Sequence, residues 1–564
     1  MTFKTILSCA TAALAITVSS SAMAANPTCA DLSKTITSKS ITIGETKMVF
    51  DDGSSPAYCL VQGKTAPRQG EDGKSYAIGF EMRLPLAWNG RFLHQVNGGN
   101  DGEVVAATGD LKNMNAVRDV TALARGFAVL SSDSGHDGKD PANKTAGLAA
   151  GAMFGFDPQA RSDYGYAADA IMATLGKQII TSYYGAAPQH SYMMGCSNGG
   201  RHAMVAATRL ADQYDGIVAG DPGFDLPRAA IQHAWDVQAL RSVDSDLKKA
   251  LSRDDMNLVS AKILEKCDAL DGLADGMIGD IKACQATFKI DDLACKDGTT
   301  QCLAPNKVAA LKKMMAGPTN SKGEKLYSDW SYDAGLNGGD WRMWKVESPI
   351  PPWGNNPIIA VMGSSSLGQV FTTPPTEIKG EPPALVDYLS TFNFDTDAPK
   401  IFAKGPAQVN GKTVEFKESA MDFMTPPDVD NPKLEAFAKK GAKLIVYHGV
   451  SDGVFSFNDT ANWYDKLNAN NSGKAADFAR LFAVPGMNHC RGGATADNFD
   501  MLGAVVAWAE AGQAPDRVIA TTRAANKEVP ETWAKDRSRA LCPYPQVARY
   551  ETGDKEKAAS FICK

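Results

Sequence analysis

The stretch that decides the fold spans residues 190–206 and reads HSYMMGCSNGGRHAMVA. Its apolar run at 192–194 indicates a short buried strand, and the residues from 201 onward have helical character. Between them, residues 195–199 form the pattern G-x-S-x-G. In a strand–turn–helix setting this pattern is typical of a nucleophile elbow, a tight turn that exposes a serine hydroxyl above a sheet. Ser197 is therefore the candidate nucleophile.

The pattern alone is weak evidence because 51 of the 564 residues are glycine, so its neighbours must support it. Upstream, the chain alternates expected strands and helices. Residues 25–75 read as short strands and turns, and the clearer elements are strands at 76–85, 91–96 and 127–132 and helices at 119–126 and 160–185. Another buried strand follows the elbow at 214–220. This alternation predicts an α/β sheet, mostly parallel.

From about Phe224 to about Leu434 the strand–helix rhythm breaks, and cysteines, prolines and tryptophans become frequent. The rhythm resumes with the strands AKLIVYHG and FARLFAV, each followed by a loop and a helix. We therefore expect a large lid inserted into one core. The predicted divisions are a signal peptide (1–24), the first part of the core (25–223), the lid (224–434) and the second part of the core (435–564).

The N-terminus carries Lys4, then the apolar run ILSCATAALAITV, then a small-x-small site ending at Ala24. This order predicts a cleaved secretory signal peptide and a periplasmic or secreted product, with no membrane anchor after cleavage. The net charge of −6 gives no basic footprint, which argues against a nucleic-acid partner. The sequence leaves the oligomeric state open.

Eleven cysteines are present, and Cys9 would leave with the signal peptide. Ten remain, an even number that predicts five disulfides in an oxidising compartment. The sequence cannot fix their connectivity. Short-range pairs are the natural candidates, and the residues available for them are Cys29 with Cys59, Cys267 with Cys284, Cys295 with Cys302, and Cys542 with Cys563.

A serine nucleophile needs a histidine base and an acid that orients it. Where the serine lies on an elbow, the acid and then the histidine follow late strands in that order. Asp452 fits in HGVSDG and His489 fits in PGMNHC. His448, which ends the strand before Asp452, is the alternative base.

The tetrahedral intermediate also needs backbone N–H donors. Asn198, which follows the nucleophile, is expected to supply one, and Gly99 the other, with Gly98 as the second choice. Cys196 and Cys490 are the chain neighbours of Ser197 and His489. If those two side chains touch, the cysteines can approach within disulfide distance.

Residues 267–278, CDALDGLADGMI, place Asp268, Asp271 and Asp275 within eight residues. Carboxylates and carbonyls are the ligands that calcium prefers, although the spacing is not that of an EF-hand. The sequence therefore leaves two interpretations open, a structural calcium site in the lid and a merely solvated acidic loop.

These motifs together resemble the tannase and feruloyl esterase family of α/β-hydrolases over nearly the whole mature chain. The resemblance rests on GCSNGG, HGVSDG, PGMNHCRGG and CDALDGLADG. It implies an α/β-hydrolase fold with a lid, a Ser197–Asp452–His489 triad and a Cys196–Cys490 disulfide. It also implies a lid calcium ion held by Asp268, Asp271, Asp275 and the carbonyls of Leu273 and Met277.

Members of the family hydrolyse galloyl, feruloyl and related aromatic esters, so the resemblance implies a secreted serine carboxylesterase acting on esters of phenolic acids. A similar bacterial branch cleaves mono(2-hydroxyethyl) terephthalate and holds the free carboxylate with a lid arginine. The apparent counterpart here, residues 362–375, has serines and no arginine. Phe455 is expected to stack on the acyl ring. The rival interpretations are a terephthalate monoester hydrolase, a peptidase of the same fold and a non-catalytic binding protein on that fold.

Overall fold

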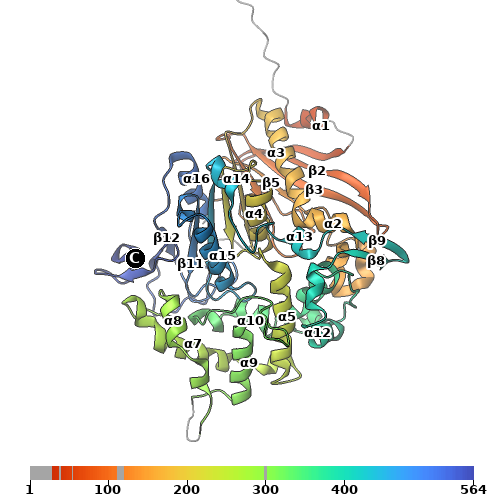
Figure 1. Ribbon diagram of the computed structural model, residues 1–564. Helices are drawn as coiled ribbons and strands as arrows, with labels where there is room; N and C mark the ends of the chain where they lie inside the picture. Colours follow the sequence, from red (N-terminus) through yellow and green to blue (C-terminus); the bar gives the residue numbers. More distant parts are fainter. Residues whose placement is uncertain (1–27, 37–39, 54, 111–119, 297–300) are drawn as a thin grey trace, which may run out of the picture.

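A nine-stranded sheet runs through the computed structural model, which describes residues 28–36, 40–53, 55–110, 120–296 and 301–564 (Figure 1). The strand order is β1-β2-β3-β5-β4-β6-β7-β10-β11. The strands are β1 (Ile41–Val49), β2 (Tyr58–Gln69), β3 (Ser75–Pro85), β4 (Arg91–Gln95), β5 (Ala128–Ser132), β6 (His190–Cys196), β7 (Gly216–Gly220), β10 (Lys443–Gly449) and β11 (Ala479–Val484). The expected signal peptide, residues 1–24, lies outside the described residues.

The sheet is parallel from β5 to β11, and β1, β2 and β3 extend it as an antiparallel edge. The mostly parallel α/β sheet is therefore confirmed. The short strands expected within residues 25–75 are longer than predicted, because β1 and β2 have nine and twelve residues and belong to this same sheet. β2 pairs with both neighbours over most of its twelve residues.

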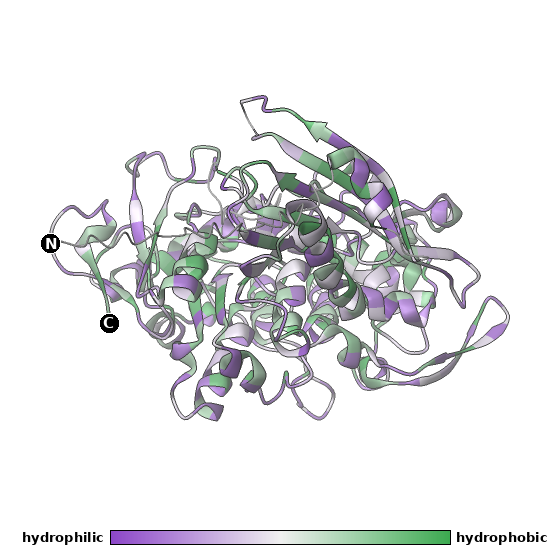
Figure 2. Cartoon of the chain, turned by 90° about the horizontal axis from the view of Figure 1, so that it is seen from above, coloured by the Kyte–Doolittle hydropathy of each residue, from purple (hydrophilic) through white to green (hydrophobic). Residues whose placement is uncertain are grey.

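Alternate residues of each strand enter different cores, as the period of two requires. In β6, Tyr192 and Met194 pack with the helix α16 (Met501–Ala511), whereas Met193 packs on the other face with α4 (Asn198–Arg209). Helices α3 (Ala168–Tyr184) and α15 (Phe457–Asn470) also cover that second face. Figure 2 shows hydrophobic residues on these inner elements and hydrophilic residues in many of the outer loops.

The helix expected at 119–126 is not formed in its described part, residues 120–126, and this prediction was wrong. Leu123 donates its backbone N–H to Thr108, outside the segment, and Gly126 has φ +88°. Local hydrogen bonds, such as Arg125 N–H to the Thr121 carbonyl, close a single turn, and a left-handed residue ends it before β5.

Residues between β7 and β10 add no strand to the described sheet and form a mainly helical region with its own hydrophobic core. In Figure 1 most of its helices lie below the sheet, whereas its last part, which includes a two-stranded hairpin, lies beside the sheet. Its longer elements are α5 (Leu226–Arg241), α7 (Arg253–Cys267), α9 (Pro305–Ala316), α10 (Gly339–Lys345), α11 (Ile358–Ser365) and α12 (Pro382–Thr391), with the hairpin β8 (Gly405–Val409) and β9 (Lys412–Phe416). This region occupies the place of the expected lid.

The remaining α-helices and strands are short. They are α1 (Leu32–Thr35), α2 (Pro158–Ser162), α6 (Leu247–Ala250), α8 (Ile281–Thr287), α13 (Ala420–Met424), α14 (Glu435–Lys440), β12 (Val518–Thr521), β13 (Ser538–Leu541), β14 (Ala548–Tyr550) and β15 (Phe561–Cys563). Among the described residues, none of the helices has the length and apolar character needed to cross a bilayer.

Five disulfides tie the fold together. The pairs are Cys29–Cys59, Cys196–Cys490, Cys267–Cys284, Cys295–Cys302 and Cys542–Cys563. Four of them close loops of 30 residues or fewer, and Cys196–Cys490 spans 294 residues. That one long-range bridge joins the two halves of the core.

Candidate active site

Ser197 occupies the sharp turn between β6 and α4, with φ +66° and ψ −126°. A non-glycine residue pays a steric cost for positive φ, and such residues gather at functional sites. The flanking glycines are required by space. A Cβ on Gly195 would lie 2.6 Å from the Gly199 carbonyl, and one on Gly199 would lie 2.6 Å from the Val96 carbonyl oxygen. The turn is therefore an elbow in geometry as well as in sequence.

The structure links the side chains of Ser197, His489 and Asp452 by two hydrogen bonds, in the order serine–histidine–aspartate. His489 Nε2 lies 2.7 Å from Ser197 Oγ, and His489 Nδ1 lies 2.7 Å from Asp452 Oδ2. The other Asp452 oxygen accepts the backbone N–H groups of Val454 and Phe455. Burial opposes ionisation of Asp452, but the charge of His489 and hydrogen bonds from His448 and His489 hold the Asp452 pKa below its ordinary value. Asp452 is therefore an ionised acid that orients the histidine.

His448 is placed behind the acid and away from this row. Its Nδ1 lies 2.8 Å from Thr460 Oγ1, and its Nε2 lies 3.2 Å from the Phe455 carbonyl and 3.4 Å from Asp452 Oδ2. Both nitrogens are thus engaged by other groups. Of the two histidines considered from the sequence, His489 is the one that contacts Ser197.

The disulfide Cys196–Cys490 fastens the elbow to the histidine loop. Its Cα atoms are 6.2 Å apart, within the range for disulfides. Since Cys196 precedes Ser197 and Cys490 follows His489, a covalent link holds the Ser197 and His489 side chains at hydrogen-bond distance.

Asn198 begins α4, so its backbone N–H is free of the helix ladder and available to an oxyanion. Its side chain is fixed on both sides: Nδ2 donates to Asp101 Oδ2 (2.9 Å), and Oδ1 accepts from Arg201 Nε (2.5 Å). Asp101 also lies 2.9 Å from His202 Nε2. The sequence analysis missed this buried hydrogen-bond network of Asp101, Asn198, Arg201 and His202. Its one sign in the sequence is that the first residues of the buried helix α4 are polar.

The two glycines considered as the second donor lie differently. A Cβ on Gly98 would come within 3.5 Å of the Ser197 Cβ, whereas a Cβ on Gly99 would meet nothing within 4 Å. Gly99 has φ +68° and its carbonyl accepts a hydrogen bond from Tyr164. Gly98 thus packs against Ser197, whereas a side chain at Gly99 would extend into open space.

Two aromatic rings stand edge-on to the histidine. The ring of Phe455 lies 5.5 Å from that of His489, and the ring of Trp344, on α10, lies 5.2 Å from it. Phe455 also fills the space beside Gly223, where a Cβ would lie 2.4 Å from the ring. Nearby, Asp340 accepts the backbone N–H of His489, and burial raises the pKa of Asp340 to about 7.

The acidic loop predicted for calcium curls around its own carboxylates at the end of α7. Asp268 accepts from the backbone of Asp275 and Gly276, and Asp271 accepts from Leu273 and Gly279. Burial, together with the neighbouring carboxylates, raises the pKa of Asp271 to about 7.

Asp275 is shared with Arg539, which donates to its carboxylate. Among the described residues, the groups whose ligand atoms lie within 4.8 Å of one another are Cys196–Asp221–Cys490 and Asp221–His448–Asp452. The first has its sulfurs in a disulfide, and the second contains the triad acid. Asp268 and Asp271 fit a hard cation by donor type and charge, whereas Asp275 would have to divide its charge between the ion and Arg539.

The parallel sheet with helices on both faces, the elbow and the acid and histidine after successive late strands define an α/β-hydrolase. The chain belongs to the family described as tannase and feruloyl esterase, which matches residues 59–564. It is 40% identical over 537 residues to a mono(2-hydroxyethyl) terephthalate hydrolase of Piscinibacter sakaiensis, covering 90% of this chain and 85% of that protein.

A probable feruloyl esterase of Arthroderma benhamiae is 29% identical over 492 residues, covering 86% of this chain and 81% of that protein. Among solved structures, feruloyl esterase B from Aspergillus oryzae superposes with a TM-score of 0.72 at 22% identity, covering 95% of this chain and 99% of that one. The likeness in fold therefore extends over the region between β7 and β10 as well as over the sheet.

Proposed function

We propose that this protein hydrolyses esters of aromatic, phenolic acids through an acyl-enzyme formed on Ser197. The observation that carries the proposal is the row Asp452–His489–Ser197, with both contacts at 2.7 Å. A serine hydroxyl is a poor nucleophile until a base takes its proton. The family, whose members include feruloyl esterases, supports the substrate class.

In the proposed mechanism His489 Nε2 accepts the Ser197 proton as Oγ attacks the ester carbonyl. The backbone N–H groups of Asn198 and Gly99 are assigned to the oxyanion. The alcohol leaves with the proton from His489, and water then attacks the acyl-enzyme by the same route in reverse. Asp452 holds the imidazole in one orientation and stabilises its charged form.

The acyl ring is assigned to the space bordered by Phe455 and Trp344. Aromatic rings pair well edge to face or offset, and both side chains already meet His489 in that way. Phe455 is 3% exposed and also packs against Gly223, so it would act as a fixed wall rather than a ring that moves to meet the substrate.

The lid serines of residues 362–375 are occupied within the protein. Ser364 donates to the carbonyls of Ala360 and Leu385, and Ser366 donates to Asn100 Oδ1 and to the Met362 carbonyl. Arg161, which contacts this segment, donates hydrogen bonds to the carbonyls of Gly155, Gln369 and Thr372 and to the hydroxyl of Thr373. These contacts favour a substrate whose acid part has no second carboxylate.

A terephthalate monoester is the second candidate substrate, because a relative that hydrolyses one is 40% identical. Initial rates on methyl ferulate, methyl gallate and mono(2-hydroxyethyl) terephthalate, measured side by side, separate the two. We expect kcat/KM for a phenolic ester to exceed that for the terephthalate monoester at least about tenfold, a difference of about 1.4 kcal/mol. A preference of that size for the terephthalate monoester would replace the proposal with the second candidate.

We further propose a structural calcium ion in the lid, held by Asp268, Asp271, Asp275 and the carbonyls of Leu273 and Met277. When bound, it would supply positive charge to a loop whose carboxylates otherwise repel one another. We also propose export to the periplasm or the medium, supported by the N-terminal pattern and by five disulfides, which persist in oxidising compartments. The N-terminal sequence of the mature protein, expected to begin at Ala25, tests export.

A further inference from the structure

Asp221 is a second buried acid beside the triad. It follows β7 directly, the strand between the elbow strand β6 and the acid strand β10, and it is fully buried. Its φ is +37°, a conformation that costs a non-glycine residue energy. Strained, buried residues gather at functional sites, and Asp221 lies at the carboxyl ends of the same strands that carry the triad. This placement indicates a function of Asp221 in addition to the triad.

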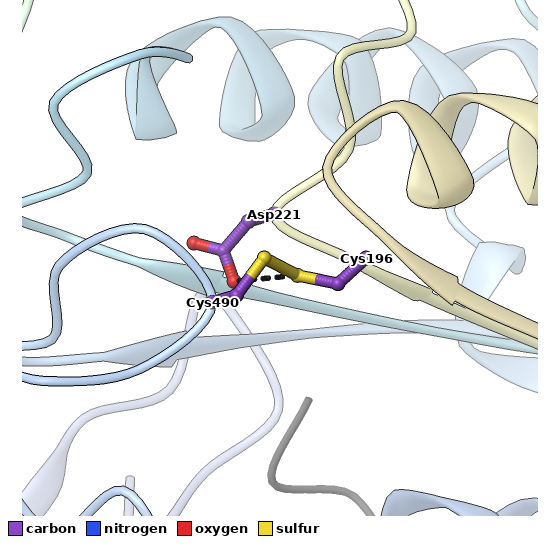
Figure 3. Close-up of side chains that lie close together, drawn as sticks. All are labelled: Cys196, Asp221 and Cys490. Atoms are coloured by element: carbon purple, nitrogen blue, oxygen red, sulfur yellow. Dashed lines mark hydrogen bonds between the residues drawn. A yellow bond between two sulfur atoms is a disulfide. The ribbon is translucent and has the colours of Figure 1, made fainter. Parts of the chain in front are cut away.

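Asp221 contacts both the strand that precedes Asp452 and the disulfide that lies next to Ser197 and His489. Its Oδ1 accepts the backbone N–H of Gly449 at 2.9 Å, and its own N–H donates to the Tyr447 carbonyl at 2.8 Å. Its Oδ2 lies 3.7 Å from the Cys196 sulfur, beside the disulfide to Cys490 (Figure 3). That sulfur has no proton to donate, because it is bonded to Cys490.

Asp221 also approaches the triad acid. A carboxylate oxygen of Asp221, a carboxylate oxygen of Asp452 and a ring nitrogen of His448 all lie within 4.8 Å of one another, and all three residues are buried. Two carboxylates this close in a buried site cannot both ionise at moderate cost, so one of them keeps a proton.

The surroundings decide which acid keeps it. Asp452 faces His489 and His448 and accepts two backbone N–H groups. Asp221 also accepts two backbone N–H groups, from Gly449 and Cys490. The side chains facing it are Tyr447, His448, Asp452 and the Cys196–Cys490 disulfide, so the difference between the two acids is the contact of Asp452 with His489. Burial, and next the charge of Asp452, raise the pKa of Asp221 well above its ordinary range. These surroundings favour the charge on Asp452 and the proton on Asp221.

We propose that Asp221 is a positioning residue that remains a neutral carboxylic acid and donates a hydrogen bond to the Asp452 carboxylate, so that the pair carries one negative charge. This inference rests on the proposed function. The neutral acid then hydrogen-bonds to the Asp452 carboxylate, which His489 also contacts through Nδ1, and the two contacts together fix its orientation. It also withdraws electron density from Asp452, which limits how strongly Asp452 stabilises the imidazolium.

The test compares Asp221→Asn with Asp221→Leu in the full chain. Asparagine is neutral, nearly isosteric and keeps an N–H donor, whereas leucine has similar bulk and no donor. The readout is the acid limb of the kcat/KM–pH profile, which reports the essential base of the free enzyme. We expect the limb to stay within about 0.3 unit in Asp221→Asn and to move to higher pH by about 0.5 unit or more in Asp221→Leu, with a lower kcat.

A limb that moves about one unit to lower pH in Asp221→Asn would mean that the native residue carries a charge, and it would overturn the proposal. A limb that does not move in Asp221→Leu would overturn it as well. If Asp221→Leu does not fold, infrared difference spectra of the native protein against Asp221→Asn at neutral pH decide. The proposal requires the C=O band of a protonated carboxylic acid, lost in the variant, and absence of that band contradicts it.

The spectrum is independent of turnover, so it separates this inference from the proposed function. If Ser197→Ala keeps full esterase activity, the proposed function fails. The infrared band then still reports whether Asp221 is neutral.

Discussion

Cys196 and Cys490 are bonded to each other across 294 residues of chain, and each is the immediate neighbour of a residue in the catalytic row. The bond makes the Ser197–His489 distance a covalently restrained quantity. Without the bond, that distance would depend on packing between two loops alone. The first prediction concerns this restraint.

Replacing both cysteines, as Cys196→Ala/Cys490→Ala, is expected to lower kcat on an aromatic ester more than it raises KM. The loops would separate, and a nucleophile and base displaced by about 1 Å can lose about 100-fold in rate. The matched control is Cys29→Ala/Cys59→Ala, which removes a bridge at the edge of the sheet. Either pair costs about 2–5 kcal/mol of unfolding free energy. Equal kcat values in the two variants would contradict the restraint.

Asp101→Asn is expected to lower kcat about tenfold with little change in KM. The Asp101 carboxylate holds the Asn198 amide and His202, and the backbone of Asn198 is the proposed oxyanion donor. Loss of a whole donor costs about 100- to 1000-fold, so displacement should cost less. Asp137→Asn, on the exposed surface, serves as the control. Unchanged kcat in Asp101→Asn would remove this network from the mechanism.

Asp340→Asn is expected to reduce the pH dependence of the unfolding free energy between about pH 4 and pH 7. Burial raises the pKa of Asp340 to about 7, so in this window the native state keeps a proton that the unfolded chain releases. The native protein must then lose stability as pH rises. Because the side chain is partly exposed, we expect a fall of about 1–2 kcal/mol. Urea unfolding at about pH 4.5 and pH 7.5 measures it, and an identical pH dependence in both proteins would refute it.

Removal of calcium with a chelator is expected to lower the melting temperature by several degrees and leave the triad contacts intact. A bound ion stabilises the folded state by mass action, and the loop is next to Cys267 rather than the active site. Asp271→Asn should abolish the response to added calcium, whereas Asp291→Asn, at another acidic position of the lid, should keep it. If neither chelator nor added calcium changes the melting temperature, the loop binds no calcium and the solvated acidic loop is the right interpretation.

Much of this arrangement follows from local sequence. Ser197 could be placed because glycines on both sides are needed for a turn that an apolar strand precedes, and Asp452 and His489 each follow an apolar run of strand character. The strands β1 and β2 were predicted too short because their residues alternate incompletely and include polar side chains near the sheet edge. Edge strands carry a weaker periodic signal than buried ones.

The groups that sequence could not reveal act through space. Asp221 and Asp101 lie 231 and 351 positions, respectively, from the triad acid Asp452, and only the folded sheet brings Asp221 against that acid and Asp101 against Asn198. The helix expected at 119–126 is a single turn in its described part, because Gly126, in a left-handed conformation, ends it and Leu123 donates its N–H to Thr108 outside the segment.

The central claim is that Ser197 attacks aromatic esters, and the most direct test is kcat/KM on methyl ferulate for the native protein and for Ser197→Ala. Circular dichroism first establishes that the variant is folded. The account predicts a loss of at least about 10⁴-fold, because a triad without its nucleophile keeps only the oxyanion and binding contributions. A folded Ser197→Ala protein that hydrolyses the ester at the native rate would contradict it.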